Sequence, residues 1–213
     1  MLDRQKAFQP APWLAKLGLP IRPQAKRISL FCYEPSALKQ WIQCLINSGD
    51  LHDLLVAPGR PQAAIEAILD DVARTDWRDG KSVSQGNLTI HPVPYLSQND
   101  FDHLLWSCHL NMIRGEDSLV RAIWAGKPFV WNIYPQDDDA HHKKLEAFLN
   151  WLQAPSSLQE FHQLWNGMTS KGKLIVDERT AEDWLTCVQS ARSRLIEQPD
   201  LVTQLLQTVI LPL

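Results

Sequence analysis

The chain has 213 residues, of which 45% are hydrophobic, and a formal net charge of −3. This length and hydrophobic content fit one domain, or at most two small ones, with a sizeable core. The small negative charge and the scattered lysines and arginines exclude the basic footprint that nucleic-acid-binding proteins carry.

The predicted elements alternate between strands and helices along most of the chain. Residues 1–27 contain a short helical pattern around 13–17 followed by glycine and prolines, which is typical of a linker or docking arm. Five apolar runs then have strand length: 28–33, 54–57, 88–93, 110–113 and 129–133. Helical spacing predicts helices over 35–47, 61–74, 98–108, 119–125, 137–152, 158–165, 180–197 and 200–211.

This order of elements predicts the fold class. Strand–helix alternations followed by helices indicate an α/β protein with a doubly wound, Rossmann-like parallel sheet and a helical C-terminal tail. We therefore expect an arm over 1–27, a ligand-binding domain over 28–155, and helices over 156–213 that pack on that domain. The segment 76–86 is polar and rich in turn residues, and so predicts a loop. Thr180 and the acidic residues after it predict a capping box at the start of a tail helix.

The turn after the fourth predicted strand, Arg-Gly-Glu-Asp-Ser, is well equipped to bind an anion. Gly115 allows the backbone to bend tightly, and Asp117 or Ser118 can cap the following helix. The start of that helix offers unpaired N–H groups and a partial positive charge, and Arg114 can grip two phosphate oxygens. The alternative is that Asp117 and Ser118 only cap the helix and that Arg114 only pairs with Glu116 or Asp117.

Aromatic side chains lie at the ends of two other predicted strands. Phe31 and Tyr33 follow the first strand, and Tyr95 and Gln98 follow the third. Because the carboxyl ends of parallel strands meet at one edge of the sheet, these rings could enclose a flat base. Gln98 offers both a donor and an acceptor to a pyrimidine. Core packing is the alternative for Phe31.

The block RGEDSLVRAIWAGKPFVWNIYPQ at residues 114–136 resembles the signature of the bacterial elongation factor P arginine rhamnosyltransferases, the EarP family. The similarity extends from ISLFCYE near residue 28 to DLVTQLLQTVI near the end. Members of this family are inverting glycosyltransferases of the two-domain GT-B architecture. The resemblance implies a carboxyl-terminal domain that binds dTDP-β-L-rhamnose, from which the whole enzyme transfers rhamnose to an arginine of elongation factor P.

The resemblance also implies a role for each candidate side chain. Rings would line the thymine, a glutamine would contact it, an arginine would neutralise phosphate, and the turn would donate to the diphosphate. The rings are those of Phe31, Tyr33 and Tyr95, the glutamine is Gln98 and the arginine is Arg114. The turn residues are Gly115, Asp117 and Ser118. Glu116 matches a glutamate regarded as essential in the family, and we expect it to accept from sugar hydroxyls or to hold Arg114 in place. Tyr95 stands where relatives often carry phenylalanine.

No metal or other cofactor is predicted. Negative charge on the departing diphosphate can be stabilised by a helix amino terminus and Arg114 without a metal. His141 and His142 are adjacent on a predicted helix, and we interpret both as surface residues. The four cysteines form no CxxC pair, which disfavours a zinc site and a disulfide framework: Cys32, Cys44, Cys108 and Cys187. Reduced core cysteines, no signal-peptide pattern and no apolar run near the ~20 residues of a spanning helix favour a cytoplasmic protein.

In the family, the aspartates that activate the acceptor arginine belong to an amino-terminal domain, as does most of the surface that binds elongation factor P. An arginine guanidinium keeps its proton, so its activation needs positioned carboxylates. We therefore expect this chain to be inactive in transfer without such a domain. The alternative is a noncatalytic interaction module that keeps the fold and docks through its helical tail. A Rossmann dehydrogenase is disfavoured, because the first predicted turn, 33–37, has no glycine for a dinucleotide.

Overall fold

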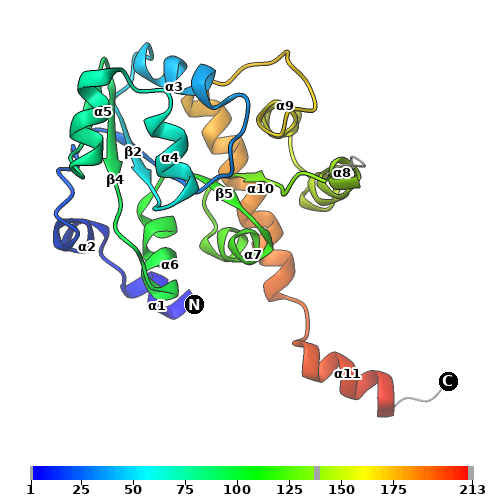
Figure 1. Cartoon of the computed structure of the whole chain (residues 1–213). Coiled ribbons are helices and arrows are strands. Elements are labelled where there is room, and N and C mark those ends of the chain that lie inside the picture. Colours follow the sequence, from blue (N-terminus) through cyan, green and yellow to red (C-terminus); the bar gives the residue numbers. More distant parts are fainter. Residues whose placement is uncertain (1, 137–139, 211–213) are drawn as a thin grey trace.

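The computed structural model describes residues 2–136 and 140–210 and confirms the predicted doubly wound α/β fold (Figure 1). Six strands form one sheet in the order β3-β4-β2-β1-β5-β6. Their bounds are β1 Lys26–Leu30, β2 His52–Val56, β3 Val83–Gln85, β4 Leu88–Pro92, β5 Leu110–Arg114 and β6 Phe129–Asn132. All neighbouring strands are parallel except β3, which pairs antiparallel with β4 at one edge.

Helices surround this sheet and continue beyond it (Figure 1). Their bounds are α1 Leu2–Ala7, α2 Pro10–Lys16, α3 Leu38–Ile46, α4 Arg60–Glu66, α5 Asp71–Arg78, α6 Gln98–Ser107, α7 Glu116–Ala125, α8 Ala140–Leu152, α9 Ser156–Trp165, α10 Glu178–Ile196 and α11 Leu201–Ile210. None of the described helices is both long and apolar enough to span a membrane.

The core lies on both faces of the sheet, which explains why most strand residues are apolar. All five residues of β2 are buried. Leu54 belongs to one core cluster with Trp41 of α3, whereas Leu55 packs in a second cluster with Leu104 of α6. Because successive side chains of a strand point to opposite faces, α3 and α6 cover opposite sides of the sheet.

Two helix predictions are wrong in detail because aspartates cap helices at other places. The helix predicted over 61–74 is divided into α4 and α5, since Asp70 Oδ1 accepts a hydrogen bond from Ala73 N at 2.9 Å and caps α5. As a result, α5 and β3 occupy part of the segment 76–86 that was predicted to be a loop. The capping box predicted at Thr180 is replaced by Asp177, whose Oδ1 accepts from Thr180 N at 2.8 Å.

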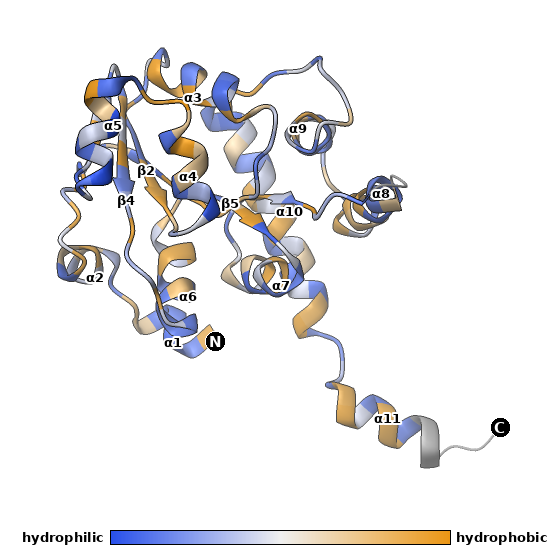
Figure 2. Cartoon of the chain, viewed as in Figure 1, coloured by the Kyte–Doolittle hydropathy of each residue, from blue (hydrophilic) through white to orange (hydrophobic). Residues whose placement is uncertain are grey.

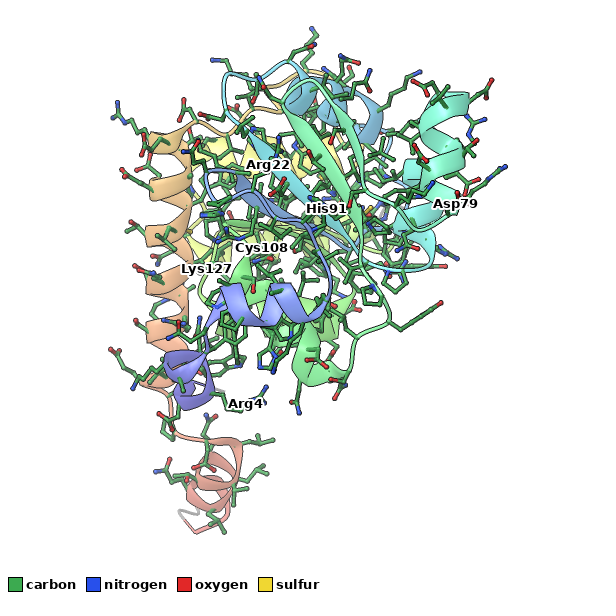
Figure 3. All side chains as sticks on the ribbon, turned by 90° about the vertical axis from the view of Figure 1, so that its left-hand side faces the viewer. Arg4, Arg22, Asp79, His91, Cys108 and Lys127 are labelled. Carbon is green, nitrogen blue, oxygen red and sulfur yellow. The ribbon has the colours of Figure 1, made fainter. Side chains whose placement is uncertain are left out.

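The arm before β1 is packed onto the sheet through a buried carboxylate. Arg22 Nε lies 2.9 Å from Asp53 Oδ1, and Arg22 N donates to Asp53 Oδ2 at 2.8 Å. His91 Nε2 lies 3.4 Å from the same carboxylate; Figure 3 labels both Arg22 and His91. Burial alone would raise the pKa of Asp53, but hydrogen bonds from His91 and Arg22 outweigh it and hold the pKa below its ordinary value. The predicted division at residue 27 stays a prediction.

The helical tail packs on the domain through α10 and extends beyond it in α11. Trp184, Val188 and Ala191 of α10 are buried. Helix α11 projects from the body, and orange bands along it mark apolar residues (Figures 1 and 2). The first turn of the helix predicted over 137–152, and the last residue of the one predicted over 200–211, lie outside the described residues.

Candidate functional site

The candidate site lies where the order of the strands reverses. The chain moves from β1 to β2 on one side and returns through α6 to β5 on the other side of β1. Leu30 and Met112 pair near the carboxyl ends of β1 and β5, so the residues after these strands are neighbours. Open α/β sheets bind ligands at such a switch point. The structure brings Tyr33 and Arg114 together there, as the sequence predicted.

Arg114 lies between two aromatic rings at this edge. Its guanidinium carbon is 4.4 Å from the ring centroid of Phe31 and 4.9 Å from that of Tyr33. Its Nη1 donates to Cys32 O at 3.3 Å. No carboxylate of the described residues forms an ion pair with Arg114, so the alternative that it pairs with Glu116 or Asp117 is wrong. The site therefore contains a positioned cation that no carboxylate of residues 2–136 or 140–210 neutralises and that can attract an anion.

The turn after Arg114 presents backbone N–H groups rather than side-chain caps. Gly115 has φ 71° and occupies the N-cap position of α7, where no side chain caps the helix. The expectation that Asp117 or Ser118 is the N-cap is therefore wrong. Asp117 instead forms an ion pair with Arg121 at 3.0 Å, and Ser118 is buried. The first helical bond is from Leu119 N to Gly115 O, so the three N–H groups before it have no carbonyl partner within the helix, and only that of Glu116 interacts with a described side chain, its own carboxylate.

Glu116, the first residue of α7, is ionised and paired with a lysine. Its Oε1 lies 2.6 Å from Lys144 Nζ of α8, and this hydrogen bond lowers the pKa of Glu116. Glu116 forms no ion pair with Arg114 among the described residues, so the expectation that it holds Arg114 in place is wrong. Its side chain is 65% exposed. The carboxylate is thus accessible beside the turn, and acceptance from sugar hydroxyls stays a prediction.

Phe31 and Gln98, two of the residues predicted to contact a base, lie on the α6 side of the site. Phe31 is half-buried and packs edge-on against Phe101 of α6, with ring centroids 5.5 Å apart. Gln98 is exposed at the start of α6, one turn before Phe101 and so on the same helix face. Tyr95 is 87% exposed, and its ring is not among those that contact Phe31 or Tyr33 in the described residues. The aromatic enclosure of a base stays a prediction.

A cavity of about 450 Å³ lies next to Tyr33. Its lining includes Tyr33, Arg60, Asn132, Tyr134 and Asn166. The rings of Tyr33 and Tyr134 meet edge-on, with centroids 5.5 Å apart. This volume lies within the range of small-molecule sites.

Two asparagines that the sequence analysis missed fix the loop that carries Tyr33. Asn132 Oδ1 accepts from Tyr33 N at 2.8 Å, and Asn132 Nδ2 donates to Asn166 Oδ1 at 3.2 Å. Asn166 Nδ2 in turn donates to Trp131 O at 2.9 Å. These bonds join the loop after β1 to β6 and to the end of α9. Isolated asparagines carry no spacing signal that could have identified them.

A neutral histidine is hydrogen-bonded to the backbone of Trp131, which belongs to this network. His162 is fully buried, and its Nε2 accepts from Trp131 N at 3.0 Å. Its Nδ1 lies 2.8 Å from Leu158 O and therefore carries the proton. Burial lowers the pKa of His162 to about 4. The imidazole is uncharged at neutral pH, because a proton on Nε2 would face the Trp131 N–H.

Of the remaining predictions, the one for His141 is wrong and the one for two of the cysteines is confirmed. His141 is buried, with Nδ1 accepting from Gln136 N at 3.1 Å, so its assignment as a surface residue is wrong. Cys32 and Cys108 are core residues, and burial raises the pKa of each thiol to about 12. Within residues 2–136 and 140–210, no three His, Cys, Asp or Glu side chains are grouped as metal ligands. Metal independence stays a prediction.

A second cavity, of about 550 Å³, lies at the amino ends of the strands. Apolar residues such as Trp41 and Leu45 line it, together with Lys26 at the start of β1. It is at the opposite edge of the sheet from the switch point, so it forms no part of the candidate site.

Comparisons with known proteins show what the whole chain is similar to. A sequence model of the family described as Elongation-Factor P (EF-P) rhamnosyltransferase EarP matches residues 1–209. The chain is 38% identical over 219 residues to a protein-arginine rhamnosyltransferase of Pseudomonas putida, and 36% identical over 225 residues to that of Pseudomonas aeruginosa. These matches cover 96% and 97% of this chain.

One solved structure is similar over almost the whole chain. It is described as the structural basis for EarP-mediated arginine glycosylation of translation elongation factor EF-P, and it matches with a TM-score of 0.78 and 33% identity. The match covers 97% of this chain and 69% of that one. The chain spans only 57% of the length of each of the two Pseudomonas relatives.

Proposed function

The chain belongs to the EarP family of elongation factor P rhamnosyltransferases, and from that premise we propose that it is the donor-binding part of a protein-arginine rhamnosyltransferase. The donor is dTDP-β-L-rhamnose, and the sugar is transferred with inversion to an arginine of elongation factor P. The solved relative is described as glycosylating arginine of that factor. Because translation takes place in the cytoplasm, we expect the enzyme to act there.

The observation that carries the proposal is the cation at the switch point. Arg114 lies 4.4 Å from the Phe31 ring centroid and 4.9 Å from that of Tyr33, with no ion-pair partner among the described residues. A guanidinium there, beside the open N–H groups at the start of α7, suits the diphosphate of a nucleotide sugar.

The same groups suit the reaction. Inverting transfer breaks the bond between the anomeric carbon and the diphosphate, and negative charge grows on the leaving group. Arg114 and the N–H groups of residues 116–118 can stabilise that charge, and loss of one such donor typically costs about 10²–10³ in rate. Glu116, which is ionised and accessible, is the catalytic candidate and would accept from sugar hydroxyls.

This chain alone is proposed to bind the donor without transferring the sugar. Glu116 is accessible, but we propose that the carboxylates that activate the acceptor and most of the binding surface for elongation factor P belong to an amino-terminal part of the whole enzyme. The lengths of the relatives, of which this chain spans 57%, leave room for such a part.

The test is calorimetric titration of the chain with dTDP and then with dTDP-rhamnose, for the wild type and Arg114→Ala. We expect saturable binding by the wild type and at least tenfold weaker binding by the variant, because a charge-assisted hydrogen bond is lost. Absence of heat at millimolar nucleotide, from a chain shown to be folded by circular dichroism, would refute an autonomous donor site.

The second candidate function is a noncatalytic interaction module. The observation that favours it is the apolar surface of α11, where four large side chains are 53–70% exposed: Leu201, Val202, Leu205 and Leu206. Such a module would not respond to nucleotide, so a thermal shift with dTDP separates the two candidates.

A further inference from the structure

Two guanidinium groups contact the Tyr33 ring, one from the start of α4 and one from the end of β5. The guanidinium carbon of Arg60 is 5.8 Å from the Tyr33 ring centroid, and that of Arg114 is 4.9 Å from the same centroid. We propose that Arg60 is a second phosphate-binding residue, which contacts the phosphate farther from the base of a nucleoside diphosphate. This inference rests on the proposed function and assigns Arg60 a place within that site.

The sheet topology explains how the two arginines meet at one ring. Strand β1 is flanked by β2 and β5, and Tyr33 follows β1. Arg60 follows β2 after a turn at Gly59, which has φ 86°, and Arg114 ends β5. All three strands are parallel, so their carboxyl ends present these side chains at the same edge.

Arg60 differs from most other arginines of the chain in its lack of partners. Five arginines form ion pairs with carboxylates: Arg4, Arg22, Arg74, Arg78 and Arg121. Within the described residues, Arg60 has neither an ion pair nor a side-chain hydrogen bond. Its guanidinium makes a cation–π contact with the Tyr33 ring. It is exposed at the lining of the 450 Å³ cavity, so its five donors are available to a ligand.

The position of the cavity decides which phosphate Arg60 would contact. Phe31 and Gln98, the proposed base contacts, lie on the α6 side of the site and do not line the cavity, whereas Tyr33 and Arg60 line it together with residues of β6 and the end of α9. A nucleotide that extends from the base past Arg114 would therefore bring its second phosphate to Arg60 and the attached sugar into the cavity. Two guanidiniums would then share the charge of the departing diphosphate.

The test compares binding of dTDP and dTMP by calorimetry in four variants of the full chain. For Arg60→Ala we expect dTDP to bind about tenfold or more weakly, because hydrogen bonds to a charged group are lost. Binding of dTMP should change by less than about twofold, since it lacks the second phosphate. Arg60→Lys should lose less affinity for dTDP than Arg60→Ala, because it keeps the charge but not the fork. Arg114→Ala should weaken both ligands.

Arg179→Ala is the matched control, since Arg179 is an exposed arginine of α10 and its loss removes the same charge. Its affinities should equal those of the wild type. Unchanged dTDP binding by Arg60→Ala, with binding lost in Arg114→Ala, overturns this inference and leaves the proposed function standing. Equal weakening of dTDP and dTMP by Arg60→Ala also overturns it. Failure of the wild type to bind dTDP overturns both.

Discussion

Acid should destabilise this protein through His162, which lies beneath the network that holds Tyr33. The imidazole is fully buried, accepts from Trp131 N and has a pKa of about 4, against about 6.5 for an exposed histidine. Between these two values the unfolded chain binds a proton that the folded chain does not. Stability contributed by His162 is therefore present above about pH 6.5 and is lost as the pH falls toward 4.

The size of the effect follows from the two pKa values. The full difference corresponds to about 3 kcal/mol, of which about 2 kcal/mol is lost between pH 7.5 and pH 5. For a chain of this length, 2 kcal/mol lowers the melting temperature by roughly 4–8 °C. Trp131 O also accepts a hydrogen bond from Asn166, Asn166 is bonded to Asn132, and Asn132 is bonded to Tyr33 N. Because these bonds position Tyr33, the same acidification should weaken nucleotide binding.

The assay is urea unfolding at pH 7.5 and pH 5.0, with His162→Gln as the reference. Other groups titrate equally in both proteins, so their contributions cancel when the two changes in stability are subtracted. We expect the wild type to lose about 2 kcal/mol more than His162→Gln over this interval. Equal losses in the two proteins would refute the argument that His162 stays neutral on folding.

Three further predictions concern stability and charge. Asp53→Asn should cost about 3 kcal/mol in urea unfolding, because the substitution removes one partner of a buried ion pair. Gly86→Ala should cost at least about 1–3 kcal/mol in the same assay, since φ is 55° and a Cβ would lie 2.5 Å from a backbone oxygen; Gly49→Ala, where nothing lies within 4 Å, should be nearly neutral. In Lys144→Gln, the pKa of Glu116 measured by NMR should rise toward 4.5, and an unchanged value would show that Lys144 does not set it.

Much of the fold could be predicted because the strands are covered on both faces. Runs of mostly apolar residues indicated all five parallel strands, and β2 illustrates why, since every one of its residues is buried. Strand β3 gave no such signal. It has three residues at the edge of the sheet, and only Val83 is buried. The division between α4 and α5 depended on Asp70 as a cap, which competed with an apolar spacing that continued across it.

The site was predictable where topology alone brings residues together. Tyr33 follows β1 and Arg114 ends β5, and these two strands are adjacent and parallel, so the meeting of the two side chains follows from strand order. Asp117 was expected to cap α7, but its carboxylate forms an ion pair with Arg121, one turn further along the helix. Gly115 occupies the N-cap position instead. Arg60 could not be identified from sequence, because the Pro-Gly before it indicates only the end of a strand, and its contact with Tyr33 depends on how the loops pack.

The central place of β1 in the sheet has a consequence for the order of folding. Lys26 pairs with His52, a close neighbour in the chain, whereas Ile28 pairs with Leu110, which is far along it. Closing the larger loop costs more chain entropy, so contacts of this kind form slowly. During synthesis, β1 and β2 can pair while β5 has yet to emerge from the ribosome. Competence to bind a nucleotide should therefore appear as a late kinetic phase, after most of the secondary structure has formed.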